Sequence, residues 1–451
     1  MKSLKLFEIL KAVGGICHQF SDCEITAITT DSREIPENAL FIALKGEKFD
    51  GNNFVVGAFE KGAVACIADK SANIPPQKNL ILVDDSNQAL LDLAHFYRTL
   101  LKTKIVAITG SVGKTTTKEM IYAVLNEKFD TMKTMSNLNN LIGLPKTLLG
   151  ISDSCQAAVL EMGMSELTEI SRMSKCATPD ISVITNVGVS HLETLKTRDN
   201  ILKAKMEITH GMQKHTPLII NTDNDMLKTV MSHEYHLITY AINDKTAQVR
   251  AINIQSGERE TSFTIKTVKS ECSVTIPCVG EHNVYNALAA YAVGKCFLMT
   301  DEEIVNGLKN YTPSGMRQRF SEVGGVTLVE DCYNASPDSM KAAVKTLAQM
   351  SVSGKKVAVL GDMLELGSVS VKAHREIGEL LSELKIPAVC FGEMAKHIFE
   401  GCVQNGGDAK HFESKSEAAA FLKQTLKSGD VAWFKASRGM KFEEIIEEFS
   451  K

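Results

Sequence analysis

The pattern of apolar and polar positions divides the chain into three successive α/β stretches. In the first stretch, short apolar runs between polar turns predict strands, and Asn87–Leu101 predicts a helix. The expected strands are Ile25–Thr29, Ala39–Leu44, Val64–Ile67 and Leu80–Val83. We expect these elements to form a small N-terminal α/β domain over residues 1–102.

The second stretch opens with the apolar run Ile105–Ile108, a glycine-containing loop and a helical pattern over Lys114–Asn126. Further apolar runs predict buried strands at Ala157–Leu160, Ile181–Thr185 and Pro217–Ile220. Strands that alternate with helices are typical of a doubly wound, mainly parallel sheet with helices on both faces. Between Val249 and Cys278 apolar and polar residues alternate, which predicts antiparallel strands that extend this central domain over 103–312.

The third stretch begins near Pro313 and again alternates strands with helices. Its expected strands are Val326–Val329, Lys356–Leu360, Ala388–Phe391 and Val431–Phe434. This pattern predicts a C-terminal Rossmann-like domain over 313–451. The expected fold class is therefore α/β with three domains. The length of 451 residues agrees, because domains usually contain about 100–200 residues.

Composition and charge argue against several classes of function, among them nucleic-acid binding and membrane-spanning proteins. The formal net charge of −4 gives no sign of a basic nucleic-acid surface. Eleven scattered cysteines form no CxxC pair, which is typical of buried thiols in a reducing compartment. Glu8 and Lys11 interrupt the apolar N-terminus, and no run approaches the ~20 apolar residues of a membrane span. We expect a cytoplasmic protein without a membrane span or nucleic-acid partner.

The strongest chemical signal is the sequence TGSVGKTT at Thr109–Thr116, between a predicted strand and a predicted helix. That context is typical of a nucleotide phosphate loop, here a P-loop of the central domain. Glycines let backbone N–H groups approach phosphate oxygens, and the helix N-terminus adds partial positive charge. The expected nucleotide contacts are Gly110, Ser111, Val112, Gly113, Lys114, Thr115 and Thr116. The usual GxxxxGK[ST] pattern would place a glycine at Ile108, so this cradle is shorter, and the alternative is a glycine turn with an incidental lysine.

Three further residues are metal or catalytic candidates. Glu161 and His191 each follow a predicted strand, at the sheet edge where ligands bind in open α/β folds. Lys205 shares a helical stripe with apolar residues, so it must extend to solvent, pair, or be chemically altered. The alternatives are a solvated acid at Glu161, a structural histidine at His191 and simple extension to solvent at Lys205.

Together these motifs resemble the Mur ligase family of peptidoglycan synthesis along nearly the whole chain. TGSVGKTT resembles the family's ATP loop, and LEMG, NVGVSHLE and AKMEI resemble the motifs that carry Glu161, His191 and Lys205. The stretches at Ser136–Pro145, Asp331–Ser339 and Leu360–Gly367, the last followed by His374, resemble the branch that adds D-alanyl-D-alanine. The DNPR-type motif of the related branch that adds the third amino acid is absent.

The resemblance implies an ATP-dependent ligase that joins D-alanyl-D-alanine to a UDP-N-acetylmuramoyl-tripeptide. The tripeptide carboxylate would attack the γ-phosphate, and the amine would then displace phosphate from the acyl phosphate. ATP and Mg²⁺, with a second Mg²⁺ expected, are the implied cofactors, and Lys205 is expected to be carbamylated by CO₂. The implied catalytic residues are Lys114, Lys205 and His191, and the implied metal ligands are Thr115, Glu161, His191 and Lys205. The protein is expected to be a monomer.

The resemblance also implies binding residues in each domain. Asn283 and Asn286 would face adenine, and Arg317 and Asp331 would lie on the nucleotide side. The implied substrate-binding residues are Ser32, Arg33, Lys45, Gly46, Asn139, Asn140, Tyr333, Asn334 and Ser336. The branch usually has asparagine at position 336 and glycine at position 436, where this chain has Ser336 and Ala436. The alternatives are helix capping by Asn283 and a solvated turn at Ser32 and Arg33.

Other functions stay open from the sequence alone. Another Mur ligase or a folylpolyglutamate synthetase would share the ATP chemistry. A non-catalytic P-loop nucleotide switch would hydrolyse nucleotide without an acceptor and would leave Glu161, His191 and Lys205 unexplained. A scaffold protein has little support beyond the chain length. The sequence does not decide between lysine and diaminopimelate as the third residue of the tripeptide.

Overall fold

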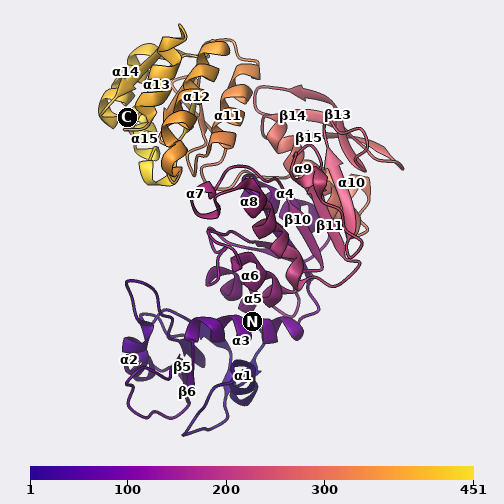
Figure 1. Cartoon of the computed structure of the whole chain (residues 1–451), viewed down its shortest axis with the longest axis vertical. Helices are drawn as coiled ribbons and strands as arrows, with labels where there is room; N and C mark the ends of the chain where they lie inside the picture. Colours follow the sequence, from indigo (N-terminus) through magenta and orange to yellow (C-terminus); the bar gives the residue numbers. More distant parts are fainter. The chain divides into compact units, whose positions relative to one another are not determined.

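A computed structural model describes residues 1–451 (Figure 1). The fold divides into two compact units. One comprises Met1–Ala107, Phe129–Ser182 and Glu207–Thr216, and the other comprises Ile108–Lys128, Val183–Met206 and Pro217–Lys451. Four-, nine- and six-stranded sheets follow one another along the chain, beside a two-stranded ribbon. The strands of these three sheets lie within residues 27–83, 104–276 and 319–435, respectively.

The N-terminal sheet has four parallel strands in the order β3-β4-β5-β6. The elements of this region are β1 (Leu4–Lys5), α1 (Leu6–Val13), β2 (Glu24–Ile25), β3 (Ala27–Thr29), β4 (Ala39–Ile42), η1 (Gly51–Phe54), α2 (Val55–Glu60), β5 (Ala65–Asp69), β6 (Leu80–Val83) and α3 (Ser86–Thr99). The single strand predicted at Ile25–Thr29 was wrong. Its first residue pairs antiparallel with β1, whereas Ala27–Thr29 begins the parallel sheet.

The nine-stranded sheet has the order β15-β14-β13-β12-β11-β10-β7-β9-β8. Its strands are β7 (Lys104–Thr109), β8 (Thr131–Lys133), β9 (Ala157–Glu161), β10 (Ile181–Ile184), β11 (Pro217–Asn221), β12 (His236–Ala241), β13 (Val249–Ser256), β14 (Thr261–Lys266) and β15 (Glu271–Ile276). Strands β11, β12 and β13 are parallel, and β13, β14 and β15 form the predicted antiparallel extension. Alternate side chains such as Phe263 and Val274 are buried, as the sequence pattern indicated.

The helices of this region connect the strands of the nine-stranded sheet or follow its last strand. They are α4 (Lys114–Asn126), α5 (Gly143–Leu149), α6 (Glu169–Ala177), α7 (Leu192–Leu195), α8 (Arg198–Met206), η2 (Glu207–Gly211), η3 (Leu227–Thr229), α9 (Glu281–Cys296) and α10 (Asp301–Lys309). Helix α4 packs against both α9 and α10. Gly307 allows α10 to approach the α4 backbone closely, because a Cβ at this position would lie 2.5 Å from the Cα of Val124.

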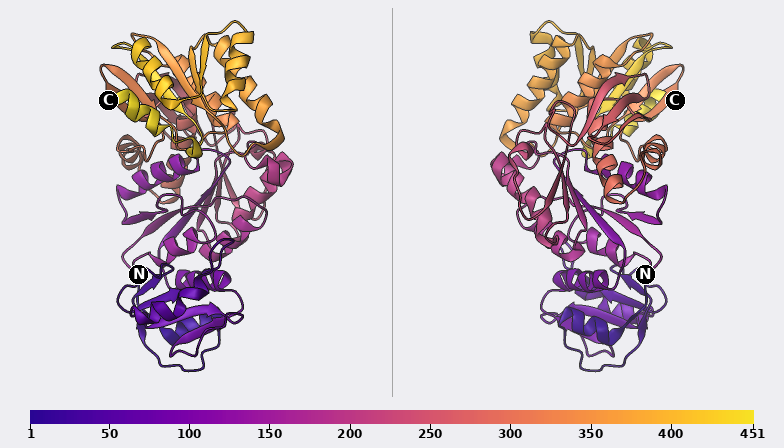
Figure 2. Two further views of the ribbon diagram at one scale, coloured as in Figure 1. Left: turned by 90° about the vertical axis from the view of Figure 1, so that its left-hand side faces the viewer. Right: turned by 90° about the vertical axis from the view of Figure 1, so that its right-hand side faces the viewer.

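The C-terminal sheet has the order β16-β17-β21-β18-β19-β20, with only β16 antiparallel to its neighbour. Its elements are β16 (Arg319–Val323), β17 (Val326–Glu330), α11 (Pro337–Gln349), β18 (Lys356–Gly361), η4 (Gly367–Val369), α12 (Ser370–Glu383), β19 (Ala388–Phe391), α13 (Ala395–Gln404), β20 (Ala409–Phe412), α14 (Lys415–Thr425), β21 (Val431–Lys435), η5 (Arg438–Met440) and α15 (Glu443–Ser450). Two apolar clusters lie on its two faces, one lined by α11, α12 and α13 and the other by α14 and α15. This layering, drawn in orange and yellow in Figure 2, confirms the Rossmann-like prediction.

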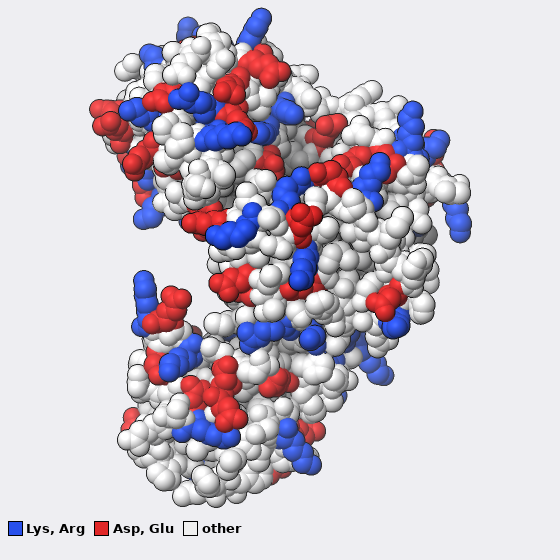
Figure 3. All heavy atoms as spheres, viewed as in Figure 1, with Lys and Arg blue, Asp and Glu red and all other residues white.

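Acidic and basic side chains are interspersed over the face drawn in Figure 3. None of the helices combines the length and apolar content needed to cross a membrane.

We expect Gly307→Ala to lower the free energy of unfolding by about 1–3 kcal/mol, because the added methyl group meets backbone that cannot rotate away. Gly57→Ala is the matched control, since no atom lies within 4 Å of its Cβ position. Alanine's better helix propensity should leave that variant equally stable or more stable, by up to about 1 kcal/mol. Urea unfolding followed by circular dichroism measures both variants, and equal effects would contradict the close packing of α10 on α4.

Candidate active site

The predicted phosphate loop lies between β7 and α4, as the sequence indicated. Two of its glycines have positive φ angles, 156° at Gly110 and 83° at Gly113. At Gly110 a Cβ would overlap the Thr185 hydroxyl, and Gly113 is the N-cap of α4. The loop therefore requires glycine at both positions, for its backbone conformation and for its close approach to β10.

Residues just after β10 fix the shape of this loop. The Asn186 side-chain oxygen accepts hydrogen bonds from the backbone N–H groups of Ser111 and Val112, each at 3.0 Å. Its amide nitrogen donates to the Val112 carbonyl at 3.2 Å, and the Thr185 hydroxyl donates to the same carbonyl at 2.7 Å. The backbone N–H of Gly188 donates to the Ser111 hydroxyl at 2.9 Å. Sequence reasoning missed Thr185 and Asn186, although their place at the end of a predicted strand was a usable signal.

Lys114 lies at the first position of α4 and folds back over the loop. Its ammonium donates to the Gly110 carbonyl at 2.8 Å and to the Ser111 carbonyl at 3.4 Å. These carbonyls hold a positive charge beside backbone N–H groups at the N-terminus of a helix, where a phosphate group is favoured. Thr115 and Thr116 follow in the same first turn.

The two asparagines predicted on the adenine side are joined to each other and to α4. Asn286 donates to the Asn283 side-chain oxygen at 3.1 Å and accepts from the Thr117 hydroxyl at 2.9 Å. They therefore face the same way, as their spacing predicted. Asn283 is not the N-cap of α9, because Gly280 occupies that position. Instead it donates to the Val279 carbonyl at 2.9 Å and to the Gln318 side-chain oxygen at 3.0 Å.

Gln318 and His282 complete this polar network, and no sequence pattern indicated either residue. Burial lowers the pKa of His282 to about 4, so the imidazole is neutral at physiological pH. The Gln318 amide donates to its Nε2 atom at 2.8 Å. The neutral ring is thereby fixed in one orientation beside Asn283.

The C-terminal candidates lie around the end of β17 and the start of α11. The Arg317 guanidinium stacks over the Tyr333 ring, 3.6 Å from its centroid. The Asp331 carboxylate accepts from the buried Lys435 ammonium at 2.7 Å. Ser336 caps α11 in a reciprocal pair with Ser339, and the adjoining Asn334 is exposed. The serine that departs from the family pattern thus has a structural role at the helix start.

Ala436, the second departure from the family pattern, is fully buried beneath the end of β21. It packs in the apolar cluster under α14 and α15. His374, noted in the sequence, is also buried and accepts from the backbone N–H of Met363 at 2.9 Å. It therefore supports the loop after β18.

Lys205 is only 1 % exposed, and its neighbours Ile201, Ala204 and Ile208 are also buried. The predicted apolar stripe is therefore confirmed, although α8 ends at Met206 and Ile208 belongs to a 3₁₀ turn. The side chain does not extend to solvent, which rules out the simplest of the readings offered by the sequence.

The charge state of Lys205 follows from this burial. Removal from water, and then the positive charge of Lys114, lower its pKa well below that of a free lysine, and no acidic side chain offsets them. The neutral amine is therefore favoured. A neutral amine is a nucleophile, and it can react with CO₂ to form an anionic carbamate.

Glu161 and His191 are two further metal candidates, and each has a defined local structure. Glu161 is buried at the end of β9, where its carboxylate accepts from the Asn139 amide at 2.9 Å and its backbone N–H donates to the Thr134 hydroxyl at 3.0 Å. His191 has a φ of 64° and precedes α7 as its N-cap. No three His, Cys, Asp or Glu side chains gather as a ready-made metal cluster. The predicted ligand set contains only two residues of those types.

The remaining substrate candidates lie in turns of the first unit. Asn140 accepts from the backbone N–H groups of Ile142 and Gly143 and so begins α5. The Arg33 guanidinium is largely exposed and forms an ion pair with the Asp31 carboxylate at 2.6 Å. Hydrogen bonds donated by Arg33 lower the pKa of Asp31. Ser32, in the same turn, uses its backbone carbonyl to accept from Lys61 at 2.8 Å.

The second predicted turn is held by backbone hydrogen bonds. The Lys45 backbone exchanges two hydrogen bonds with the Asn87 side chain, and the backbone N–H of Gly46 donates to the Phe49 carbonyl at 2.8 Å. Arg33, Ser32 and Lys45 remain predictions as substrate contacts.

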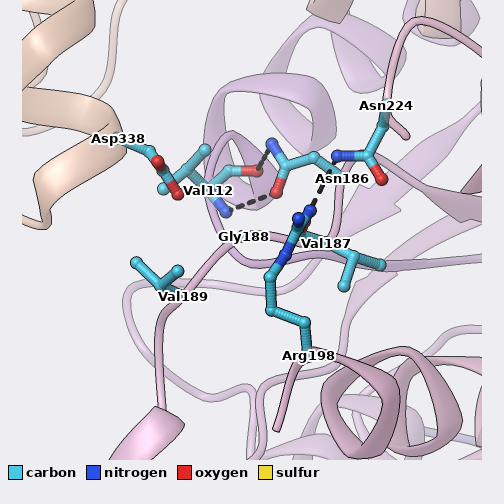
Figure 4. A pocket seen from close by; sticks show the side chains of 8 residues that line it. All are labelled: Val112, Asn186, Val187, Gly188, Val189, Arg198, Asn224 and Asp338. Carbon is cyan, nitrogen blue, oxygen red and sulfur yellow. Dashed lines mark hydrogen bonds between the residues drawn. The ribbon is translucent and has the colours of Figure 1, made fainter. Parts of the chain in front are cut away.

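A pocket of about 320 Å³ lies beside the phosphate loop (Figure 4). It is lined by Val112, Asn186, Val187, Gly188, Val189, Arg198, Asn224 and Asp338. Arg198 holds both oxygens of Asp225 at 2.6 and 2.7 Å and donates to the Val187 carbonyl at 2.9 Å. Asp338 reaches the pocket from the start of α11. Neither Arg198 nor Asp338 was singled out as a site residue in the sequence.

Comparisons with known proteins cover the whole chain. Family models described as Mur ligase family, catalytic domain, Mur ligase middle domain, and Mur ligase, glutamate ligase domain match residues 24–103, 108–294 and 317–438, respectively. A UDP-N-acetylmuramoyl-tripeptide–D-alanyl-D-alanine ligase of Bacillus subtilis is 41 % identical over 95 % of this chain and 94 % of its own length. The Escherichia coli protein of the same name is 33 % identical over 99 % of this chain and 98 % of its own.

Two solved structures are also similar to this chain over nearly its whole length. MurF from Acinetobacter baumannii superimposes with a TM-score of 0.92 at 32 % identity, covering 100 % of this chain and 99 % of that one. MurF ligase from Thermotoga maritima, solved in complex with ADP, gives 0.85 at 30 % identity and covers 94 % and 97 %. Because the family models match most of the chain and relatives at least 30 % identical cover nearly all of it, the chain belongs to the Mur ligase family.

Proposed function

We infer that the protein is an ATP-dependent ligase that joins D-alanyl-D-alanine to a UDP-N-acetylmuramoyl-tripeptide, giving the pentapeptide precursor of peptidoglycan, ADP and phosphate. The observation that carries this is full-length similarity to relatives that bear this name, at up to 41 % identity in the Bacillus subtilis protein. The phosphate loop and the ADP complex of the Thermotoga maritima relative support ATP as the phosphoryl donor.

The chemistry requires an activated carboxylate. A free carboxylate is a poor acyl donor because its leaving group would be oxide, so its oxygen attacks the γ-phosphorus and releases ADP. The amine of D-alanyl-D-alanine then attacks the acyl carbon, a C–N bond forms, and phosphate departs with the bridging oxygen. The first step brings two anions together, and the second develops negative charge on the acyl oxygen and the departing phosphate, so cations such as Lys114 at the phosphate loop stabilise both.

The nucleotide is proposed to lie along the loop from Gly110 to Thr116, which supplies backbone N–H groups and a helix N-terminus. Asn283 and Asn286 are proposed to contact adenine, with Gln318 and His282 positioning Asn283. Arg317, stacked on Tyr333, and Asp331, paired with Lys435, are proposed for the ribose and phosphate side. Asn139, Asn140, Asn334 and the first-domain turns at Ser32, Arg33, Lys45 and Gly46 remain the proposed UDP-muramoyl-tripeptide contacts.

Thr115, Glu161, His191 and carbamylated Lys205 are proposed to hold Mg²⁺. When bound, the metal would neutralise phosphate charge in the transition state. The residues fit this role chemically, since a carboxylate, an imidazole, a hydroxyl and a carbamate all donate to hard or borderline cations. The burial and lowered pKa of Lys205 support carbamylation, because only a neutral amine reacts with CO₂.

The domain boundaries at 102/103 and 312/313, which the sequence pattern predicts, remain predictions. A monomeric state is likewise a prediction. We place the protein in the cytoplasm, which the eleven unpaired cysteines support, because free thiols persist in reducing compartments.

Phosphate release should require ATP, UDP-N-acetylmuramoyl-tripeptide and D-alanyl-D-alanine together. A coupled phosphate assay measures this, with single amino acids, including glutamate, as alternative acceptors that test a folylpolyglutamate synthetase or another Mur ligase. Steady phosphate release with neither substrate present would favour a nucleotide switch and contradict ligation.

Gly110→Ala should weaken ATP binding at least tenfold, because a Cβ at a φ of 156° would overlap the Thr185 hydroxyl and distort the loop. Gly57→Ala, with open space around its Cβ position, is the control and should bind ATP as the wild type does. Titration with a fluorescent ATP analogue measures both affinities. Unchanged affinity in Gly110→Ala would show that nucleotide does not use this loop.

Lys205→Ala should lose nearly all ligase activity, at least a hundredfold, and should be partly rescued by small carboxylates such as acetate that replace the carbamate oxygens. Lys203→Ala, on the exposed side of the same helix, should retain activity. Mass spectrometry of the intact wild type under CO₂ should show a gain of one carbamate that is absent in Lys205→Ala. Full activity of the alanine variant would rule out the proposed metal role.

A further inference from the structure

The pocket beside the phosphate loop has an acidic side chain with no partner in the chain. The Asp338 carboxylate is exposed at the start of α11 and makes no hydrogen bond within the protein. It lies directly against Gly188, because a Cβ at Gly188 would overlap its Oδ2 atom. Figure 4 shows it approaching Val112 and Gly188 from one side, with Arg198 and Asn224 on the other.

The other polar side chains of the pocket each make hydrogen bonds within the protein, although the Nε atom of Arg198 has no hydrogen-bond partner. The Arg198 guanidinium is shared between both oxygens of Asp225 and the Val187 carbonyl. The Asn224 amide donates to the same carbonyl at 3.2 Å, and both ends of the Asn186 amide hold the phosphate loop. Among the side-chain acceptors that line the pocket, the Asp338 carboxylate is the one that accepts no hydrogen bond within the protein, and acceptors are what a ligand ammonium needs.

The charges around the pocket favour a cation. One guanidinium, that of Arg198, faces three carboxylates. Asp225 raises its pKa first by hydrogen bonding, and Asp338 and Asp199 raise it through their charges. These four groups sum to two negative charges. An anion could contact only the Nε atom of Arg198 without displacing Asp225 or the Val187 carbonyl, whereas a cation can approach Asp338 without breaking any contact.

The Asp338 carboxylate lies beside the phosphate loop, where the reaction is proposed to take place. The backbone N–H of Gly188, against which Asp338 lies, donates to the Ser111 hydroxyl of the phosphate loop. A group held by Asp338 would thus be adjacent to the loop that holds the transferred phosphate. The volume of about 320 Å³ is near the lower end of small-molecule sites and suits a ligand of dipeptide size.

We propose that this pocket binds the amine acceptor and that Asp338 holds its ammonium group by a charge-assisted hydrogen bond. The proposal rests on the ligase function inferred above and deepens it, since it assigns the residue that recognises the amine end of D-alanyl-D-alanine.

Asp338→Asn tests the proposal in the full-length protein, because the amide keeps the shape of the side chain and removes its charge. The KM for D-alanyl-D-alanine should rise about 10- to 100-fold, as expected for loss of a hydrogen bond to a charged group. ATP affinity and the KM for the tripeptide substrate should stay within about twofold. Asp199→Asn, an exposed acid near Arg198 that does not line the pocket, is the matched control and should behave as the wild type.

N-propionyl-D-alanine separates recognition of the amine from a structural effect, since it has the acceptor's shape without the ammonium group. Its inhibition constant should be the same for the wild type and Asp338→Asn. An unchanged KM for D-alanyl-D-alanine in Asp338→Asn, or equal weakening of the propionyl analogue, would overturn the proposal. A wild type that releases no phosphate with both substrates would instead overturn the ligase function itself.

Discussion

The side-chain amide of Asn186 is the interaction on which the site depends. Its oxygen accepts two backbone N–H groups of the phosphate loop, and its nitrogen returns to a carbonyl of that loop. A loop of this kind has many unpaired backbone groups, and each would cost free energy if it were buried without a partner. By satisfying three of them from the end of β10, Asn186 links the loop to the sheet. The helix that follows, α4, is then held from its far side by Asn286 and by the close approach of α10.

Burial of Lys205 is the second constraint, and it acts by lowering the pKa of the side chain. Enclosure among apolar side chains without a carboxylate lowers the pKa of a lysine, since the charged form gives up its hydration without gaining a partner. Such a position is unfavourable for a structural residue and useful for a reactive one. Asp338 differs from Lys205, because its carboxylate is exposed at the rim of a pocket and makes no hydrogen bond within the protein.

Much of the fold, and the phosphate loop with it, was predictable from the amino-acid sequence. Continuous apolar runs such as Ile105–Ile108 gave the parallel strands, alternation gave the antiparallel extension, and GKTT after a strand gave the phosphate loop. The edge strands β16 and β20 were missed because they are short and partly polar. Asn186, Gln318 and Asp338 were missed for another reason, because their roles depend on contacts between segments that are far apart in sequence. No local pattern distinguishes such residues from ordinary loop positions.

The central claim is that the carboxylate of the tripeptide is phosphorylated before the peptide bond forms. It is tested most directly with UDP-N-acetylmuramoyl-tripeptide labelled with ¹⁸O in its terminal carboxylate, by mass spectrometry of the released phosphate. Attack by that carboxylate on the γ-phosphorus and later cleavage of the acyl C–O bond predict one labelled oxygen in each phosphate formed. Unlabelled phosphate accompanying pentapeptide formation would contradict the account.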